Sequence, residues 1–245
     1  MLRSRSAACV VLALLLFVVL ASTAGCGGHP QGPVVRKFFV ASRMGDATTL
    51  ANLALTAFDA RTEGEVVNLS IVSETPEQVA PLQLKALAEA FRAAQEAERQ
   101  FTDKWDAYRQ VNREAIRKVH AAVEKGLTLK GPDAAMQEEL SKWEAEGAQL
   151  TKNVSEAREA ISRERPVVEL SMRNPLKPID ATQYDGVLAT KEMTVSANMK
   201  MPDGQSAKKT LVVTLKQARM KGPQGDIAGN WIVTNVASAP GGARP

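Results

Sequence analysis

The spacing of apolar residues divides the chain from residue 33 onward into three zones. Apolar residues recur first at helical spacing and then in alternation between 33 and 74, keep a helical period from 75 to 165, and alternate again from 166 to 236. A period of two predicts strands, and a period near 3.5 predicts helices that pack against each other. The pattern therefore predicts an α+β domain formed by 33–74 and 166–236, interrupted by a helical insertion at 75–165.

The first zone predicts two short helices followed by a strand. A helix pattern begins at Val34 and ends at Gly45, and Asp46 is placed to cap a second helix. Alternation of apolar and polar residues over Val66–Val72 then predicts a strand with one buried face. These elements supply two helices and one strand to the α+β domain.

The insertion predicts a long helical hairpin. Residues 75–78 (Thr-Pro-Glu-Gln) have the spacing of a capping box with proline at the first helical position. The helical pattern pauses at the glycines of 126–131 and stops where Pro166 follows Arg165. Seams with alternating spacings of three and four run along both segments, which predicts antiparallel coiled-coil packing within one chain. We expect a monomer, and a homodimer joined through the heptads is the alternative.

Folding the two seams about the link at 126–131 predicts which residues face each other. Facing residues have numbers that sum to 258 or 259, so Asn112 lies opposite Gly147 and Ala115 lies opposite Trp143. A bulky residue then faces a small one in several layers, as packing at constant width requires.

The last zone predicts several antiparallel strands. Alternation over 195–199 and 211–215 predicts two strands joined by a turn at 202–204 (Pro-Asp-Gly), and a last strand ends near Val236. Residues 237–245 are small and rich in proline and glycine, which predicts a disordered tail.

The first 32 residues follow a different pattern. Two arginines precede an unbroken apolar run over Val10–Ala21, and small residues then lead to Cys26. This order is typical of an export signal, here residues 1–25. Counted from Ala7, the run is also just long enough to stay in a bilayer as an uncleaved anchor. Cleavage and retention of the signal are therefore both open.

The segment Thr23-Ala24-Gly25-Cys26 resembles the lipobox of bacterial lipoproteins, although that family favours leucine where Thr23 stands. In the family, the cysteine thiol carries a diacylglycerol, the signal is removed before it, and the new amino group receives a fatty acid such as palmitate. The resemblance implies lipidation at Cys26, a flexible tether over 26–32 and anchoring to a membrane outside the cytoplasm. In a host with two membranes, it implies the periplasmic face of the outer membrane.

Removal of the signal would change both the net charge and the number of cysteines. The chain has 31 basic and 27 acidic residues and a net charge of +4. Loss of Arg3 and Arg5 with the signal leaves 29 basic residues and a net charge of +2, so the basic balance no longer argues for a nucleic-acid partner. Of the two cysteines, Cys9 is also lost, and the single remaining Cys26 excludes a disulfide framework.

Without the insertion, the predicted order of elements resembles the nuclear transport factor 2-like superfamily, a cone-shaped α+β fold. The resemblance is carried by residues 34–39, by Gly45-Asp46 at the second helix and by the terminal Gly229-x-Trp231-x-Val233 strand. It covers about half of the chain. The expected fold is α+β: a curved, cone-like antiparallel sheet with N-terminal helices, carrying a long inserted antiparallel two-helix coiled-coil hairpin.

Few residues point to catalysis. Some enzymes of that superfamily place acid or base side chains inside the cone, which makes Tyr184, Asp185 and Trp231 the pocket candidates here. His120 and Glu124 lie one helical turn apart, but no third metal ligand is visible. The sequence lacks a phosphate-binding loop, a nucleophile elbow and a zinc-protease motif. We therefore expect neither enzyme activity nor a metal or cofactor.

The function expected from the sequence is that of a lipid-anchored extracytoplasmic lipoprotein. It would act as a non-catalytic binding or scaffold module whose coiled-coil arm contacts a protein partner in the cell envelope. The alternative is an enzyme or small-ligand binder that uses a cavity in the α+β cone.

Overall fold

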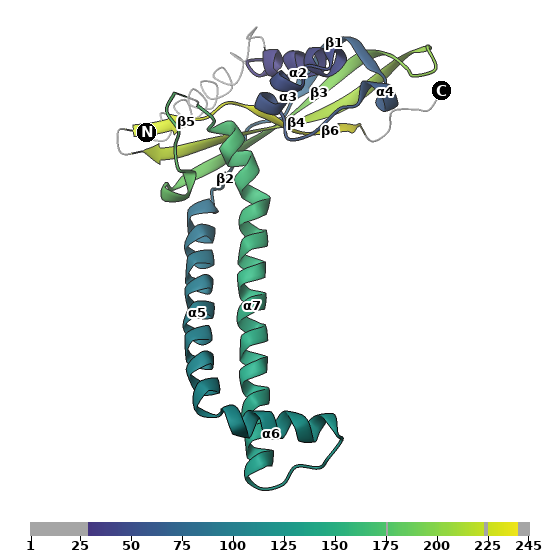
Figure 1. The fold of residues 1–245 in the computed structure, drawn as a ribbon. Coiled ribbons are helices and arrows are strands. Elements are labelled where there is room, and N and C mark those ends of the chain that lie inside the picture. Colours follow the sequence, from purple (N-terminus) through teal and green to yellow (C-terminus); the bar gives the residue numbers. More distant parts are fainter. Residues whose placement is uncertain (1–28, 175, 223–224, 240–245) are drawn as a thin grey trace, which may run out of the picture.

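The computed structural model describes residues 29–174, 176–222 and 225–239 and shows an α+β protein (Figure 1). A curled antiparallel sheet lies across one end of the molecule, and a long pair of helices projects from it. The α+β class and the antiparallel sheet are confirmed. The predicted signal segment, Cys26 and residues 240–245 lie outside the described residues.

Two long strands form the middle of the sheet, and four shorter strands line its edges. The whole of β3 pairs with residues 206–220 of β4, and the two strands are joined by the predicted turn, in which Gly204 has a φ of 85°. β1 and β2 follow one another along the outer edge of β3, and β6 and β5 do the same along β4. The strands are β1 (Glu65–Glu74), β2 (Gln78–Pro81), β3 (Gly186–Lys200), β4 (Ser206–Gly222), β5 (Gly225–Ala228) and β6 (Ile232–Ser238). β6 thus runs past the predicted strand end at Val236.

Three short helices precede the sheet. The first ends at its predicted cap, and the second begins at its predicted cap. Gly45 closes the first helix with a φ of 67°. The Asp46 carboxylate accepts a hydrogen bond from the backbone N–H of Thr49 at 3.0 Å and so caps the second. The helices are α2 (Gly32–Met44), α3 (Ala47–Leu53) and α4 (Ala60–Glu63). Both predicted N-terminal helices are confirmed, because the signals that define them are local in the chain.

The structure shortens the predicted tether of residues 26–32. Gln31 and Gly32 are buried, and Nδ1 of His29 lies 3.2 Å from the Glu74 carboxylate. A Cβ atom on Gly32 would lie only 2.8 Å from Cδ1 of Ile71. Glycine at this position therefore allows close packing of α2 on β1, and the described residues of the predicted tether, from His29 onward, belong to the folded part.

The sheet carries two hydrophobic cores on opposite faces. The unbroken pairing of β3 with β4 places odd-numbered residues on one face and even-numbered residues on the other. The first core lies under α2 and includes odd residues of both strands: Met193, Val195, Ala197, Met199, Leu211, Val213 and Leu215. The second core lies on the opposite face and includes even residues packed against helices that project from the sheet: Leu188, Ala218 and Met220 with Leu84, Val168 and Met172. In β4, burial changes from odd to even positions between Gln217 and Ala218.

Three helices, here called the arm, project from the second core. They are α5 (Leu84–Val111), α6 (Arg113–Glu124) and α7 (Pro132–Ser171). α5 and α7 lie side by side, and α6 turns across the far end of the arm (Figure 1). The 40 residues of α7 span about 60 Å at the helical rise per residue. A short 3₁₀ helix, η1 (Ala181–Gln183), then leads the chain back to β3.

Two predicted helix boundaries are wrong. The capping-box segment 75–78 begins no helix, because Oγ1 of Thr75 accepts a hydrogen bond from the N–H of Glu192 at 2.9 Å and the chain then enters β2. Pairing with a distant strand thus prevails over the local capping signal. α7 also continues through Pro166 to Ser171. Proline removes one helical hydrogen bond, but the extra turn buries Val168 and Leu170.

The predicted register of the arm is also wrong. A Cβ atom on Gly147 would lie 3.0 Å from Cε1 of Phe101, so Gly147 faces Phe101 and not Asn112. Trp143 packs against three aromatic rings of α5 instead of Ala115, with centroids 5.3 to 5.4 Å apart: Phe101, Trp105 and Tyr108. The reason is the break at Asn112, where α5 ends and α6 leaves its direction. The turn of the arm therefore includes all of α6.

Candidate functional site

The C-terminal end of α7 joins the arm to the sheet through Ser171. Along the edge of β4, pairing with β6 stops at Lys216 and pairing with β5 starts at Arg219, which leaves Gln217 and Ala218 between them. The fully buried Ser171 fills this gap. Its Oγ accepts a hydrogen bond from the N–H of Ala218 at 2.9 Å and donates one to the carbonyl of Asn230 at 2.7 Å. The N–H of Asn230 in turn donates to the carbonyl of Ser171 at 2.7 Å.

Glycine at position 229 makes this close approach possible. A Cβ atom there would lie 2.5 Å from Oγ and 2.7 Å from the carbonyl oxygen of Ser171. The N–H of Gly229 donates to the carbonyl of Ala218 at 2.9 Å, and its carbonyl accepts from Nε2 of Gln217 at 2.7 Å. We call Ser171, Ala218, Gly229 and Asn230 the junction. Its hydrogen bonds replace the strand pairing that β4 lacks at this point.

A second polar network, centred on Arg219, continues from the junction. The Arg219 guanidinium donates to both carboxylate oxygens of Glu77, at 2.6 and 2.8 Å, and to Oε1 of Gln217 at 2.8 Å. The hydrogen bond from Arg219 lowers the pKa of the Glu77 carboxyl, and the same contact raises the pKa of Arg219. Because Gln217 also binds Gly229, the segment before β2 and the junction belong to one network.

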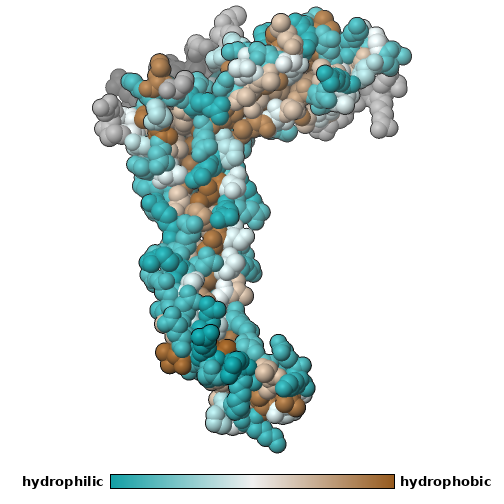
Figure 2. All heavy atoms as spheres, in the orientation of Figure 1, coloured by the Kyte–Doolittle hydropathy of each residue, from teal (hydrophilic) through white to brown (hydrophobic). Residues whose placement is uncertain are grey.

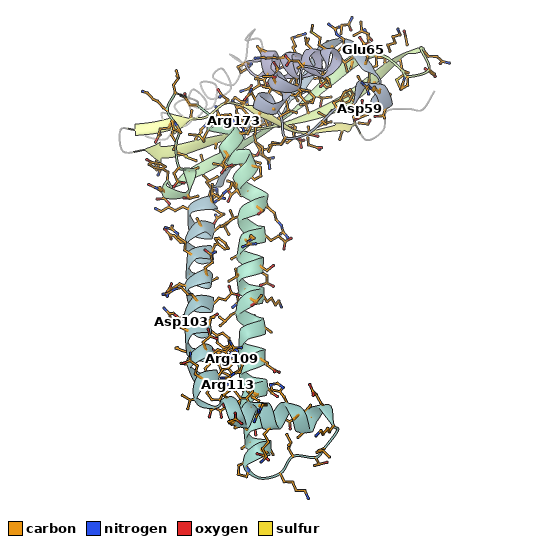
Figure 3. All side chains as sticks on the ribbon, viewed as in Figure 1. Asp59, Glu65, Asp103, Arg109, Arg113 and Arg173 are labelled. Atoms are coloured by element: carbon orange, nitrogen blue, oxygen red, sulfur yellow. The ribbon has the colours of Figure 1, made fainter. Side chains whose placement is uncertain are left out.

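Arg173 connects the end of α7 to the N-terminal helices. Its guanidinium donates to the carbonyl of Ala51 and to Oδ1 of Asn52, both at 3.1 Å. Figure 3 shows Arg173 where α7 meets the sheet. The arm is therefore attached to α3 as well as to β4.

The start of α5 is fixed by two more contacts. Oε1 of Glu164, on α7, accepts a hydrogen bond from the N–H of Gln83 at 3.0 Å and so supplies the cap that the local sequence lacks. Nζ of Lys85 lies 2.9 Å from Oδ2 of Asp185, and this hydrogen bond raises the pKa of Lys85. Both helices of the arm are thus braced at its base.

An open cleft of about 590 Å³ lies beside the junction. Its walls are the end of α7, the segment that leads to η1 and the connection from β5 to β6, and its polar side chains include Arg173, Asn174, Lys177, Tyr184 and Asp226. Of the three predicted pocket residues, only Tyr184 lines this cleft. Asp185 is exposed and paired with Lys85, and Trp231 packs against the core under α2.

The face of the sheet under α2 is filled with apolar side chains, among them the fully buried Met193. In the described part of the chain, the buried polar side chains are Gln31, Ser171 and Gln217. Each described carboxyl group with a clear pKa shift has a lowered pKa, because a side-chain hydrogen bond favours its ionised form: Asp46, Glu77, Glu96, Glu138 and Asp180. Such carboxylates serve as caps and ion-pair partners and are poor proton donors near neutral pH.

The far end of the arm exposes apolar side chains. Val111, Val123 and Leu127 are 85%, 47% and 59% exposed, and Figure 2 shows hydrophobic surface at this end. α6 is nevertheless held in place, because Val119 and Leu140 are buried. The far end of the arm is therefore ordered and exposes apolar side chains before α6 (Val111) and near or after its end (Val123 and Leu127); these three residues are here called the tip.

Within residues 29–174, 176–222 and 225–239, no helix is both long enough and apolar enough to cross a bilayer. Within the same ranges, no group of three His, Cys, Asp or Glu side chains is arranged to hold a metal ion. His120 and Glu124 are both exposed on α6. No protein-family model, curated protein or solved structure matches the chain.

Proposed function

We propose that this protein is a lipid-anchored extracytoplasmic lipoprotein that acts as a non-catalytic binding or scaffold module. Its arm contacts a protein partner in the cell envelope, and Cys26 carries the lipid. The observation that carries the proposal is an arm about 60 Å long that is braced at its base and apolar at its tip. Exposed apolar side chains gathered at one end of an ordered arm favour a protein interaction site there.

Along the rest of the arm, charged side chains form ion pairs within each helix, so the tip is the better candidate for a partner contact. Exposed ion pairs one helical turn apart line the helices: Glu96–Arg99, Asp106–Arg109, Glu138–Lys142 and Glu159–Arg163. Such pairs keep a surface solvated and add little stability. The aromatic cluster around Trp143 stiffens the arm, and together with the heptad spacing it supports coiled-coil packing of α5 against α7.

A photo-crosslinking experiment in intact cell envelopes tests the role of the tip. A crosslinking amino acid replaces Leu127 at the tip or, as a control, the exposed Glu144 in the first third of α7. We expect one discrete adduct at 127 and none at 144, and replacing Val111 and Val123 by serine should remove it. Identical adducts at both positions, or none at 127, would contradict the proposal.

The anchor is tested separately. Cys26→Ala is expected to release the protein from membranes into the soluble envelope fraction, because the acyl chains supply the attachment. The mass of the N-terminal peptide of the parent protein should show the lipid directly. Continued membrane retention of the Cys26→Ala variant would favour an uncleaved signal anchor.

The cleft beside the junction supports a second candidate, a small-ligand binder. Arg173, Lys177 and Tyr184 line it together with one carboxylate, Asp226, and the excess of positive charge suits a small anionic molecule. Native mass spectrometry of the protein purified from its host should then show a retained ligand that Tyr184→Ala and Lys177→Ala reduce. A protein free of bound mass in both forms would remove this candidate.

A further inference from the structure

The outward side of α2 combines positive charge with apolar groups. Arg36, Lys37 and Arg43 are exposed on it together with Val40 and Met44, which are 45% and 74% exposed. At 100° per residue, these five positions fall within a sector of about 120°, so they form one continuous face. α2 contains no acidic residue. We call these five residues the α2 face.

The arginines of the α2 face are held in place by the edge of β1. Nη1 of Arg36 donates to the carbonyl of Leu69 at 3.1 Å, and Nη1 of Arg43 donates to that of Val67 at 3.4 Å. A shallow groove of about 240 Å³ separates α2 from this strand. Each guanidinium keeps further N–H donors for an incoming phosphate. Glu65 forms an ion pair with Arg43 at 4.0 Å, and Asp46 interacts with Lys37. Three cations against these two carboxylates leave the face with a net positive charge.

The chain places this face close to the proposed lipid. His29, the first residue that the structure describes, contacts Glu74 through its ring. Only two residues, Gly27 and Gly28, separate His29 from Cys26, and the three Cα–Cα steps between Cys26 and His29 reach at most about 10 Å when fully extended. A lipid on Cys26 would therefore keep the N-terminal end of α2 at the membrane surface.

We propose that the α2 face docks on a bilayer surface of anionic phospholipid. This inference rests on the lipid anchor proposed above and adds the orientation of the protein on the membrane. The cations bind headgroup phosphates, while Val40 and Met44 enter the interface between headgroups and acyl chains. Since α2 and the arm lie on opposite faces of the sheet (Figure 1), docking directs the arm away from the membrane. The tip then meets its partner at a distance from the bilayer.

The test uses the full chain, purified with its lipid and reconstituted into vesicles. An environment-sensitive fluorophore is attached at Met44→Cys on the α2 face or at Leu127→Cys on the tip, and brominated lipids serve as quenchers. We expect strong quenching at position 44 and little at 127 in phosphatidylcholine vesicles that contain one quarter phosphatidylglycerol. Without phosphatidylglycerol or at high salt, quenching at 44 should fall, because screening weakens the attraction.

Charge-neutralising variants identify the residues responsible. Arg36→Gln with Lys37→Gln and Arg43→Gln should reduce quenching at 44 to the level at 127, because each lost cation lowers the equilibrium constant for docking about fivefold. The control neutralises three exposed cations of the arm, Lys104, Arg113 and Lys125, and should change nothing. Figure 3 shows Arg113 at the end of the arm remote from Glu65, which lies on the α2 side of the sheet.

The outcomes separate this inference from the anchor. An acylated, vesicle-bound chain whose label at 44 is no more quenched than the label at 127 would overturn the inference alone. Equal effects of the two sets of charge variants would overturn it as well. A chain without acyl mass would overturn the anchor and, with it, the inference.

Discussion

Ser171 is the residue on which the attachment of the arm to the sheet depends most. Its hydroxyl is the hydrogen-bond partner of the buried Ala218 N–H, so Ser171→Ala leaves a buried donor unpaired. We expect a loss of about 1–3 kcal/mol in the free energy of unfolding, measured by urea denaturation. The control is Ser162→Ala on the exposed side of the same helix, where the hydroxyl only binds the carbonyl of Arg158. Equal stability of the two variants would show that the junction contributes nothing special.

Glu77 makes part of the stability depend on pH. Arg219 lowers the pKa of Glu77 below its ordinary value of 4.5, so the pair stabilises the fold above that pH and loses its effect as pH falls through the lowered pKa. Glu77→Gln should cost about 1 kcal/mol near pH 7, a modest value because the Arg219 side chain is 36% exposed and solvent screens the pair. In urea denaturation near pH 3, the free energies of unfolding of the variant and the parent should become similar. A difference independent of pH would contradict this assignment.

At the scale of elements, the register of the arm gives a sharp test. The structure places Gly147 against Phe101, whereas the seam alone pairs it with Asn112. A double-mutant cycle of Gly147→Ala with Phe101→Leu should give a coupling energy above about 0.5 kcal/mol. The cycle with Asn112→Ala should give none beyond error. The higher helix propensity of alanine cancels in both cycles. Coupling of Gly147 to Asn112 alone would instead support the register predicted from the seams.

The elements that the sequence predicts correctly are those whose signals are local. Gly45 and Asp46 act within one turn of the helices that they end and begin. By contrast, Thr75 and Glu77 find partners 117 and 142 residues away, so their capping-box spacing is misleading. The break at Asn112 shifts the whole register of the arm, and a periodic pattern that continues through it cannot show where the helix bends.

The junction could be predicted only in part. The change of burial from odd to even positions at Gln217 and Ala218 is visible as apolar residues at 211, 213 and 215 and then at 218 and 220. It signals that β4 passes from one core to another. That Ser171 fills the gap beside Ala218 follows from a contact with Asn230 across 59 residues, and nothing in the local pattern marks it. Of the predicted pocket residues, Tyr184 reaches the cleft because it directly follows η1, which lies against the arm.

For the whole molecule, the two opposite cores mean that the arm cannot be removed at its predicted boundaries without damage to the sheet. A deletion of residues 78–165 would remove β2 and much of the second core, namely Leu82, Leu84, Ala88 and Ile161. A deletion that begins farther from the sheet avoids this damage. Oγ1 of Thr151 donates to Oε1 of Glu98 at 2.9 Å, so α5 and α7 lie close enough there to be joined by a short Gly/Ser loop.

We therefore expect the two deletions to behave differently in hydrogen exchange. The short deletion, residues 99–150, should keep protection throughout β3 and β4, because all members of the second core remain. The long deletion should lose protection at 186–190 and 218–220 but keep it at 193–199 and 211–215, where the core under α2 is untouched. Uniform loss along both strands would mean that the two cores fold as one unit. If the pattern holds, the short deletion removes the tip and leaves both the α2 face and the junction intact. Loss of the tip adduct with retained membrane docking would then show that partner contact and membrane docking depend on opposite ends of the molecule.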